Sequence, residues 1–227
     1  MLPWLHLGTA TTPEGATLRL MRRGEEFSIR LDRGTELMNS RLSGSEEALA
    51  TLAVEHLADR PALRLLMGGL GMGFTLRAAQ AAVSSEARLT VVEIVPELVE
   101  WARGPMDALF GDSLSDRRLD IRVGDVAAVI REAPGAYDAI LLDVDNGPDG
   151  LIRPGNDGLY AERGLREAQR ALAPGGVLAV WSAAPDADFT RRLRQCGFDV
   201  RTIQVRAARD RRGARHTIWL AVPTLGS

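Results

Sequence analysis

Lysine is absent from this 227-residue sequence, so each of its 28 basic residues is an arginine. That absence excludes catalysis through a lysine Schiff base or a lysine general base. The single cysteine, Cys196, cannot form an internal disulfide. The histidines His6, His56 and His216 are scattered and do not have the spacing of metal ligands. We therefore expect neither a disulfide nor a bound metal.

Aromatic residues are also scarce, at 5% of the chain, although 45% of the residues are hydrophobic. Aliphatic side chains must then fill the core, which is typical of a parallel sheet covered by helices on both faces. The net charge of -2 offers no general attraction to nucleic acids or anionic membranes. Residues Met1 to Leu7 lack the pattern of a signal peptide, and no apolar stretch reaches membrane-spanning length. We expect a cytoplasmic protein without a membrane partner.

Residues 1–42 predict a small β lead-in, which precedes a main domain at residues 43–227. Two short β segments, Ala16 to Met21 and Glu26 to Leu31, favour a hairpin. A helix is expected to begin at Ser43, whose hydroxyl can cap it while Glu46 completes a capping box. Pro61 marks the end of this helix.

From Ala62 onward, apolar strand patterns alternate with amphipathic helix patterns, as in βαβ units. The predicted strands are Arg64 to Met67, Leu89 to Val92, Leu119 to Val123, Tyr137 to Leu142, Val177 to Trp181, Asp199 to Val205 and Thr217 to Val222. The predicted helices are Phe74 to Val83, Pro96 to Leu109, Val126 to Glu132, Glu162 to Leu172 and Asp186 to Cys196. The last two strands have no helix between them and should pair as a hairpin. The expected fold is α/β, a doubly wound, mostly parallel, seven-stranded Rossmann-like sheet with an antiparallel C-terminal strand.

A glycine-rich segment follows the first strand of this pattern and precedes a helix. Gly69, Gly71 and Gly73 would let the backbone approach a ligand and direct helix-terminal amides at it. Glu93 comes twenty residues after Gly73, at the end of the next strand, where doubly wound folds place an acid that binds ribose hydroxyls. These residues predict a nucleoside site. A nicotinamide dehydrogenase is less favoured, because dinucleotide-binding loops have a two-residue second gap between their glycines.

Acidic residues follow the next two strands. Asp125 can cap the following helix and also meet the exocyclic amine of an adenine. Asp143 and Asp145 stand beyond the carboxyl end of the fourth strand, where open α/β sheets bind their ligands. They are the candidates for a proton acceptor or an amine ligand. The glycine- and proline-rich loop from Asp145 to Gly158 is either a mobile cover over the site or a slack connection.

Together these segments resemble the spermidine synthase family within the class I S-adenosylmethionine-dependent methyltransferase superfamily. The resemblance runs from about Leu31 to Trp181. It rests on the Gly-x-Gly-x-Gly turn, Glu93, Gly124-Asp125, the strand Tyr137 to Asp143 and Pro174-Gly175-Gly176, with Leu31-Asp32-Arg33-Gly34, Ser45-Glu46-Glu47 and Leu159-Tyr160 as further matches. It implies that Glu93 and Asp125 hold the ribose and adenine of S-adenosylmethionine or its decarboxylated form. It also implies that Asp143 deprotonates the attacking amine of a polyamine.

Three departures from the family pattern bear on the reaction. Gly71 stands where family members have the aspartate of Gly-Gly-Gly-Asp-Gly-Gly, and the family's Asp-Ser-Ser-Asp-Pro becomes Asp143-Val144-Asp145-Asn146-Gly147-Pro148. Leu37-Met38-Asn39 stands where a cofactor-contacting glutamine is expected. A dicationic polyamine needs several carboxylates to replace its hydration. We therefore expect methyl transfer to a small-molecule amine or hydroxyl rather than spermidine synthesis.

Three alternatives stay open beside methyl transfer. The first is a polyamine aminopropyltransferase that uses decarboxylated S-adenosylmethionine. The second is a non-catalytic nucleoside-binding scaffold, since a fold does not establish a function. The third, less favoured because stacking aromatics are absent, is nucleic-acid binding through arginines at 191, 192, 194, 206, 209, 211, 212 and 215. A homodimer that uses the β lead-in also stays open.

Overall fold

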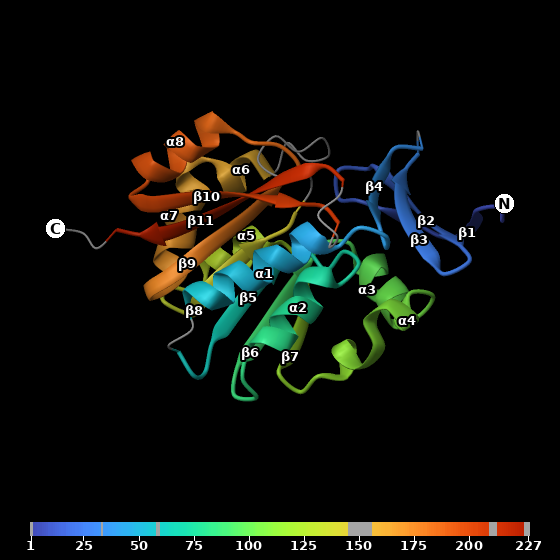
Figure 1. Ribbon diagram of the computed structural model, residues 1–227, viewed down its shortest axis with the longest axis horizontal. Helices are drawn as coiled ribbons and strands as arrows, with labels where there is room; N and C mark the ends of the chain where they lie inside the picture. The colour runs from blue at the N-terminus through green and yellow to red at the C-terminus, as the bar shows by residue number, and fades with distance from the viewer. Residues whose placement is uncertain (1, 33, 58–59, 145–155, 209–212, 225–227) are drawn as a thin grey trace.

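The alternation after residue 62 builds one seven-stranded sheet, with α/β topology as expected (Figure 1). The computed structural model describes residues 2–32, 34–57, 60–144, 156–208 and 213–224. In spatial order the strands of this sheet are β10 (Phe198–Arg206), β11 (Arg215–Pro223), β9 (Leu172–Ser182), β8 (Tyr137–Leu142), β5 (Arg64–Gly68), β6 (Arg88–Glu93) and β7 (Leu119–Val123). Five strands, β9 to β7 in this order, pair in parallel, and β11 is antiparallel to both of its neighbours. The predicted fold class is confirmed.

Alternate strand residues point to opposite faces, and helices cover both of them. Leu65 and Met67 of β5 belong to one core cluster, whereas Leu66 belongs to the other. The first face is covered by α1 (Gly44–His56), α2 (Phe74–Ala82), α3 (Pro96–Arg103), α4 (Asp107–Phe110) and the 3-10 helix η1 (Gly111–Ser115). The second is covered by α5 (Val126–Arg131), α6 (Asn156–Tyr160), α7 (Glu162–Ala171) and α8 (Ala187–Gln195). No helix among the described residues is both long and apolar enough to cross a membrane.

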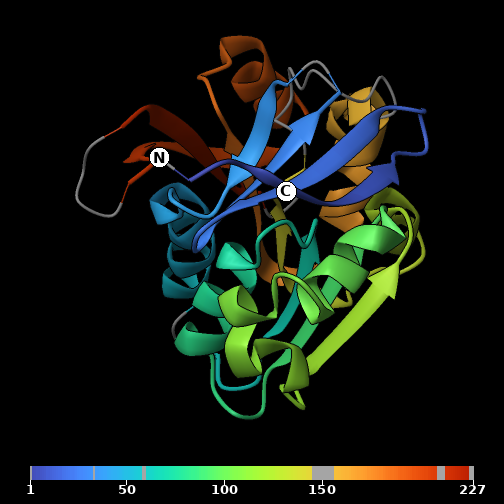
Figure 2. The ribbon, with the colours of Figure 1, turned by 90° about the vertical axis from the view of Figure 1, so that its right-hand side faces the viewer.

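The β lead-in is larger than a hairpin. It is a four-stranded antiparallel sheet, called here the N-terminal sheet, of β1 (Leu5–Thr11), β2 (Thr17–Arg23), β3 (Glu26–Leu31) and β4 (Glu36–Asn39). Strands β1 and β4 were not predicted. Most of β1 is exposed and β4 has only four residues, so neither carries a clear apolar alternation. Figure 2 shows this sheet lying across the central fold.

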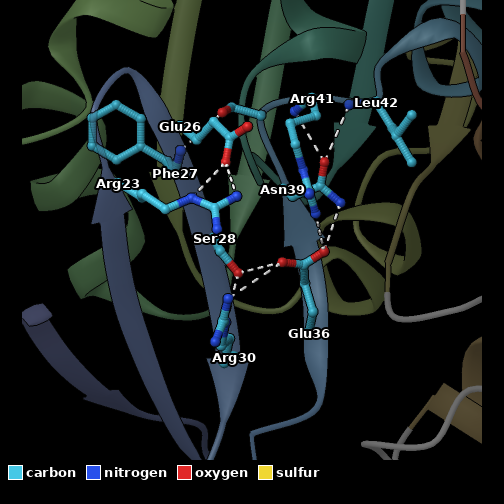
Figure 3. A network of polar contacts seen from close by, with 10 residues as sticks. Arg23, Glu26, Phe27, Ser28, Arg30, Glu36, Asn39, Arg41 and Leu42 are labelled. Carbon is cyan, nitrogen blue, oxygen red and sulfur yellow. Dashed lines mark hydrogen bonds and ion pairs between the residues drawn. The ribbon is translucent and has the colours of Figure 1, made fainter. Parts of the chain in front are cut away.

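A polar network holds β4 against β3 (Figure 3). The Glu36 carboxylate accepts hydrogen bonds from the Ser28 hydroxyl at 2.7 Å, the Asn39 amide at 2.9 Å and Arg41 at 2.9 Å. The side-chain oxygen Oδ1 of Asn39 in turn accepts hydrogen bonds from the backbone N–H groups of Arg41 and Leu42. Asn39 is therefore fixed in orientation although its strand is short.

Two predicted helix details are wrong. The helix expected from Pro96 to Leu109 is interrupted after Arg103, because Pro105 disfavours helical geometry at Gly104 before it. The capping box at the start of α1 does not form. Ser43 occupies the N-cap position, but its side chain makes no capping hydrogen bond. The Glu46 carboxylate instead accepts a hydrogen bond from the Ser45 hydroxyl.

Asp138, near the amino end of β8, ties that strand to β5 by a buried ion-pair cluster. Its carboxylate accepts from the backbone N–H of Arg64 at 2.9 Å, from the Arg64 side chain at 3.1 Å and from Arg60 at 2.7 Å. Burial alone would raise the pKa of Asp138, but the hydrogen bonds from Arg64 and Arg60 outweigh it and hold that pKa below its usual value. The ionised form therefore stabilises the fold.

Candidate active site

A cavity of about 160 Å³ lies at the carboxyl ends of β5, β6 and β8. Because the chain crosses from β5 to β6 on one side and β8 lies on the other, this is the place where doubly wound sheets open a crevice. The N-terminal sheet contributes the opposite wall. The residues that line the cavity include Thr12, Leu18, Leu37, Met38, Asn39, Glu46, Gly69, Leu70, Gly71, Met72, Phe74, Glu93, Val95, Leu98, Gly124, Asp125, Asp143, Val144 and Trp181.

The glycine loop, residues 69–73, forms the floor of the cavity between β5 and α2. Gly69 has a φ of +88°, and a Cβ there would lie 2.7 Å from the Asp143 carbonyl oxygen. Only glycine satisfies both conditions without strain. Gly71 lines the cavity, whereas Gly73, also predicted to bind the cofactor, is the N-cap residue of α2 and packs against Phe110. Gly73 thus shapes the loop from behind rather than facing a ligand.

Glu93, at the end of β6, is 5% exposed and lines the cavity. One carboxylate oxygen accepts a hydrogen bond from the backbone N–H of Leu70, and the other accepts one from Val95, each at 2.9 Å. Burial raises the pKa of Glu93, while these backbone donors favour its ionised form. The backbone N–H groups of Ile94 and Gly71 also act on this carboxylate. The side chain is therefore held in place in the wall of the cavity.

Asp125 begins α5 as its N-cap residue, as the sequence predicts. Its carboxylate accepts a hydrogen bond from the backbone N–H of Ala127 at 2.9 Å. The residue is exposed and lines the cavity beside Gly124 and Val126. The cap is confirmed, and the place of Asp125 in the cavity wall is compatible with the predicted contact to an adenine.

Asp143 and Glu46 form a pair of carboxyl groups in the cavity, called here the carboxyl pair. Asp143 follows β8 and accepts a hydrogen bond from the Thr75 hydroxyl at 2.9 Å. Burial raises the pKa of Asp143 to about 6, against the effect of Thr75. Burial and then the charge of Asp143 raise the pKa of Glu46 to about 7, against the hydrogen bond from Ser45. Both groups therefore titrate near neutral pH, where a proton acceptor is effective.

Sequence reasoning missed Glu46 as a cavity residue. Glu46 stands three residues after Ser43, as in a capping box, and a capping role was sufficient to account for an acidic residue at this position. The available signal was the Ser45-Glu46-Glu47 segment, which matched the family at this position but which we did not connect to the cavity. Only the packing of α1 beside β8 brings Glu46 next to Asp143.

Two tryptophans near the cavity differ in their surroundings. Trp101 is 7% exposed on α3 and belongs to the core, with its indole packed on Gly8 of β1. Trp181, at the end of β9, is equally buried but also lines the cavity, and its indole nitrogen has no hydrogen-bond partner. A buried N–H donor is therefore left over in the wall of the cavity.

Several sequence-based expectations lie outside the described residues. Asp145, the second catalytic candidate, is among them, as is most of the loop from Asp145 to Gly158. Of the proposed arginine patch, Arg206 and Arg215 are exposed at the ends of the β10–β11 pair, and positions 209–212 are not described. Nucleic-acid binding thus stays an untested prediction. Within the described part of the chain, no cluster of His, Cys, Asp and Glu side chains is arranged to hold a metal ion.

The sequence is similar to those of known transferases. Residues 112–215 match the family described as S-adenosyl-L-methionine-dependent methyltransferase. A polyamine aminopropyltransferase of Mycobacterium tuberculosis is 29% identical over 167 residues, which cover 72% of this chain and 30% of that protein. Polyamine aminopropyltransferase 2 of Pseudomonas aeruginosa is 32% identical over 126 residues, or 54% of this chain and 34% of the relative.

The fold of the chain is similar to that of solved spermidine synthases. Its fold matches a spermidine synthase in complex with the transition-state analogue AdoDATO, with a TM-score of 0.75 at 16% identity over 97% of this chain and 73% of that one. The spermidine synthase of Thermotoga maritima matches with a TM-score of 0.74 at 15% identity, over the same shares of the two chains. The chain spans about a third of the length of the mycobacterial relative.

Proposed function

We propose that this chain transfers an aminopropyl group from decarboxylated S-adenosylmethionine to an amine of a small polyamine. The observation that carries the proposal is the charge of the cavity. Four carboxyl groups line it, those of Glu46, Glu93, Asp125 and Asp143, and none of its described lining residues is an arginine or a histidine. Such a cavity favours a ligand that carries positive charge only.

The two candidate donors differ in this respect. Decarboxylated S-adenosylmethionine carries a sulfonium and an ammonium group, whereas S-adenosylmethionine adds a carboxylate. That carboxylate would have to leave water for a cavity whose described lining residues offer no cationic side chain, which costs free energy. The names of the two polyamine aminopropyltransferase relatives support the same donor.

This proposal replaces the preference for methyl transfer that the sequence suggested. That preference rested on three departures from the family pattern, among them the missing aspartate at Gly71. Glu46 reaches the same cavity from α1, so a carboxylate is supplied by another element. The carboxyl pair then replaces water around the donor ammonium and the incoming amine.

In the proposed reaction Glu93 holds the ribose, Asp125 contacts the adenine, and the glycine loop lies against the nucleoside. The acceptor nitrogen bonds to the carbon beside the sulfonium, and the carbon–sulfur bond breaks with its electron pair on sulfur. The nitrogen gives up one proton to the carboxyl pair, for which Asp143 is the candidate base. Catalysis is chiefly the alignment of two cationic substrates in a site that neutralises them.

Two measurements test this function. Calorimetric titration should rank decarboxylated S-adenosylmethionine above methylthioadenosine and S-adenosylmethionine, and a Glu93→Ala variant should weaken all three. With putrescine as acceptor, the expected nucleoside product is methylthioadenosine. Release of S-adenosylhomocysteine from S-adenosylmethionine would instead establish methyl transfer. Absence of binding by all three nucleosides would favour the non-catalytic scaffold.

A further inference from the structure

Three polar side chains in hydrogen-bond contact, Glu46, Ser45 and His216, lead from the cavity to the start of β11. The Ser45 hydroxyl lies 2.7 Å from a carboxylate oxygen of Glu46 and 2.8 Å from the Nδ1 atom of His216. Ser45 is fully buried in the first turn of α1, and His216 is partly exposed near the start of β11. The contact joins residues 171 positions apart in the sequence. It is therefore made by the tertiary fold and not by a local turn.

The single proton of the Ser45 hydroxyl determines the direction of the hydrogen bonds between Glu46, Ser45 and His216. Ser45 has one proton to donate, so it can donate to Glu46 or to His216 but not to both. With Glu46 ionised, Ser45 donates to the carboxylate and His216 donates its Nδ1 proton to Ser45. With Glu46 protonated, the directions reverse, and His216 then carries its proton on Nε2. Each protonation state of Glu46 therefore selects one tautomer of His216.

The surroundings of His216 and of Glu46 favour the transfer of a proton between them. Burial lowers the pKa of His216, whose ring packs edge-on against Trp181 at 4.8 Å between centroids, so a proton that arrives there is readily released. The charges that act on Glu46 are those of Asp143, beyond β8, and of Glu47 on its own helix, and α2 contributes the neutral hydroxyl of Thr75.

We infer that Ser45 and His216 relay a proton from Glu46 in the cavity to the partly exposed ring of His216 and from there to solvent. When Glu46 holds the proton, it passes that proton to the Ser45 oxygen while Ser45 passes its own to Nδ1. The resulting imidazolium loses its Nε2 proton, and the ionised Glu46 is restored. In this role the relay rests on the proposed function, because the proton is the one that the acceptor amine releases during transfer. Ser45 and His216 are positioning residues for this step.

The tautomer of His216 tests the relay without any turnover. In nitrogen-15 NMR spectra of the whole protein, with the His216 signals assigned by their loss in a His216→Gln variant, the Nε2–H form should dominate below about pH 6 and the Nδ1–H form above about pH 8. Ser45→Ala should abolish the switch. The matched control is Ser43→Ala, which removes a nearby hydroxyl that does not contact Glu46 or His216. This variant should leave the tautomer switch intact. A tautomer that stays constant in the wild type, or a switch that survives in Ser45→Ala, overturns the inference.

Kinetics separate the relay from the proposed function. If the wild type transfers the aminopropyl group, Ser45→Ala should slow a single turnover by about 10-fold or more while leaving the Kd of the donor unchanged. An equal loss of donor affinity and rate would indicate a merely structural role and would count against the relay. If the wild type transfers nothing, the proposed function fails, and the tautomer titration still decides whether the proton path exists.

Discussion

Replacing Glu46 with glutamine should stabilise the ligand-free protein at alkaline pH and leave it unchanged at acidic pH. The pKa of Glu46 is raised from its ordinary value of 4.5 to about 7, first by burial and then by the charge of Asp143. Below pH 4.5 the group is protonated in both the folded and the unfolded chain, so it has no effect on stability. Between pH 4.5 and pH 7 the unfolded chain releases a proton that the folded chain keeps, and the free energy of unfolding falls.

The size of the effect follows from that pKa. A rise of one pKa unit corresponds to about 1.4 kcal/mol, so the full rise would cost roughly 3 kcal/mol at pH 8. Glu46 is only partly buried and shares its titration with Asp143, which reduces the expected cost to about 2 kcal/mol. Glutamine resembles the protonated acid and avoids the cost. Glu46→Gln should therefore raise the free energy of unfolding by about 2 kcal/mol at pH 8 and by about zero at pH 4.

The assay is urea unfolding of wild type and variant at pH 4, 6 and 8. Glu47→Gln is the matched control, since it removes the neighbouring carboxylate on the same helix, outside the cavity lining. It should not reproduce the gain, because an acid in the first turn favours the helix. A Glu46→Gln gain that is the same at pH 4 and pH 8, or a loss at pH 8, would refute the reasoning. At pH 8 the same variant should bind decarboxylated S-adenosylmethionine about 10-fold more weakly, as expected for a lost charge-assisted contact.

Three further predictions concern other parts of the site and its support. Glu93→Gln should raise the Kd of methylthioadenosine by about 10- to 100-fold in calorimetry, and an unchanged Kd would remove Glu93 from the ribose site. Gly69→Ala should lower the Tm clearly more than Gly71→Ala, because its Cβ would lie 2.7 Å from the Asp143 carbonyl oxygen, whereas a Cβ at Gly71 would lie 3.6 Å from the Met38 sulfur. Asp138→Asn should lower the free energy of unfolding by about 1 to 2 kcal/mol at pH 7, since two partly exposed arginines lose their ionised partner. The pKa of Asp138 is held low, so that stabilising effect is present at neutral pH and disappears as the pH falls through it, and an equal loss at strongly acidic pH would contradict this assignment.

Local patterns were sufficient for most of the central fold. The bounds of β7 and β8 agree with the predicted strands, and α2 ends one residue before its predicted end. These segments are long apolar runs or clear amphipathic repeats, so their burial and their local conformation favour the same structure. The predicted helix breaks at Gly104 because Pro105 disfavours helical geometry at the residue before it. This break could have been predicted from the sequence. A short strand such as β4, whose four residues are all partly buried, carries no apolar alternation that could be recognised without its neighbours.

The sequence by itself determined the doubly wound sheet, the glycine loop and the places of Glu93, Asp125 and Asp143 at strand ends, because strand positions and strand termini follow from local periodicity and turn chemistry. Tertiary structure alone decided that Glu46 faces Asp143 rather than capping its helix, and that Ser45 meets His216. Those contacts depend on how α1 packs across β8, β9 and β11, far along the chain from one another. The charge of the cavity is a sum over elements that local patterns treat one at a time, which is why the preferred donor changed once they were brought together.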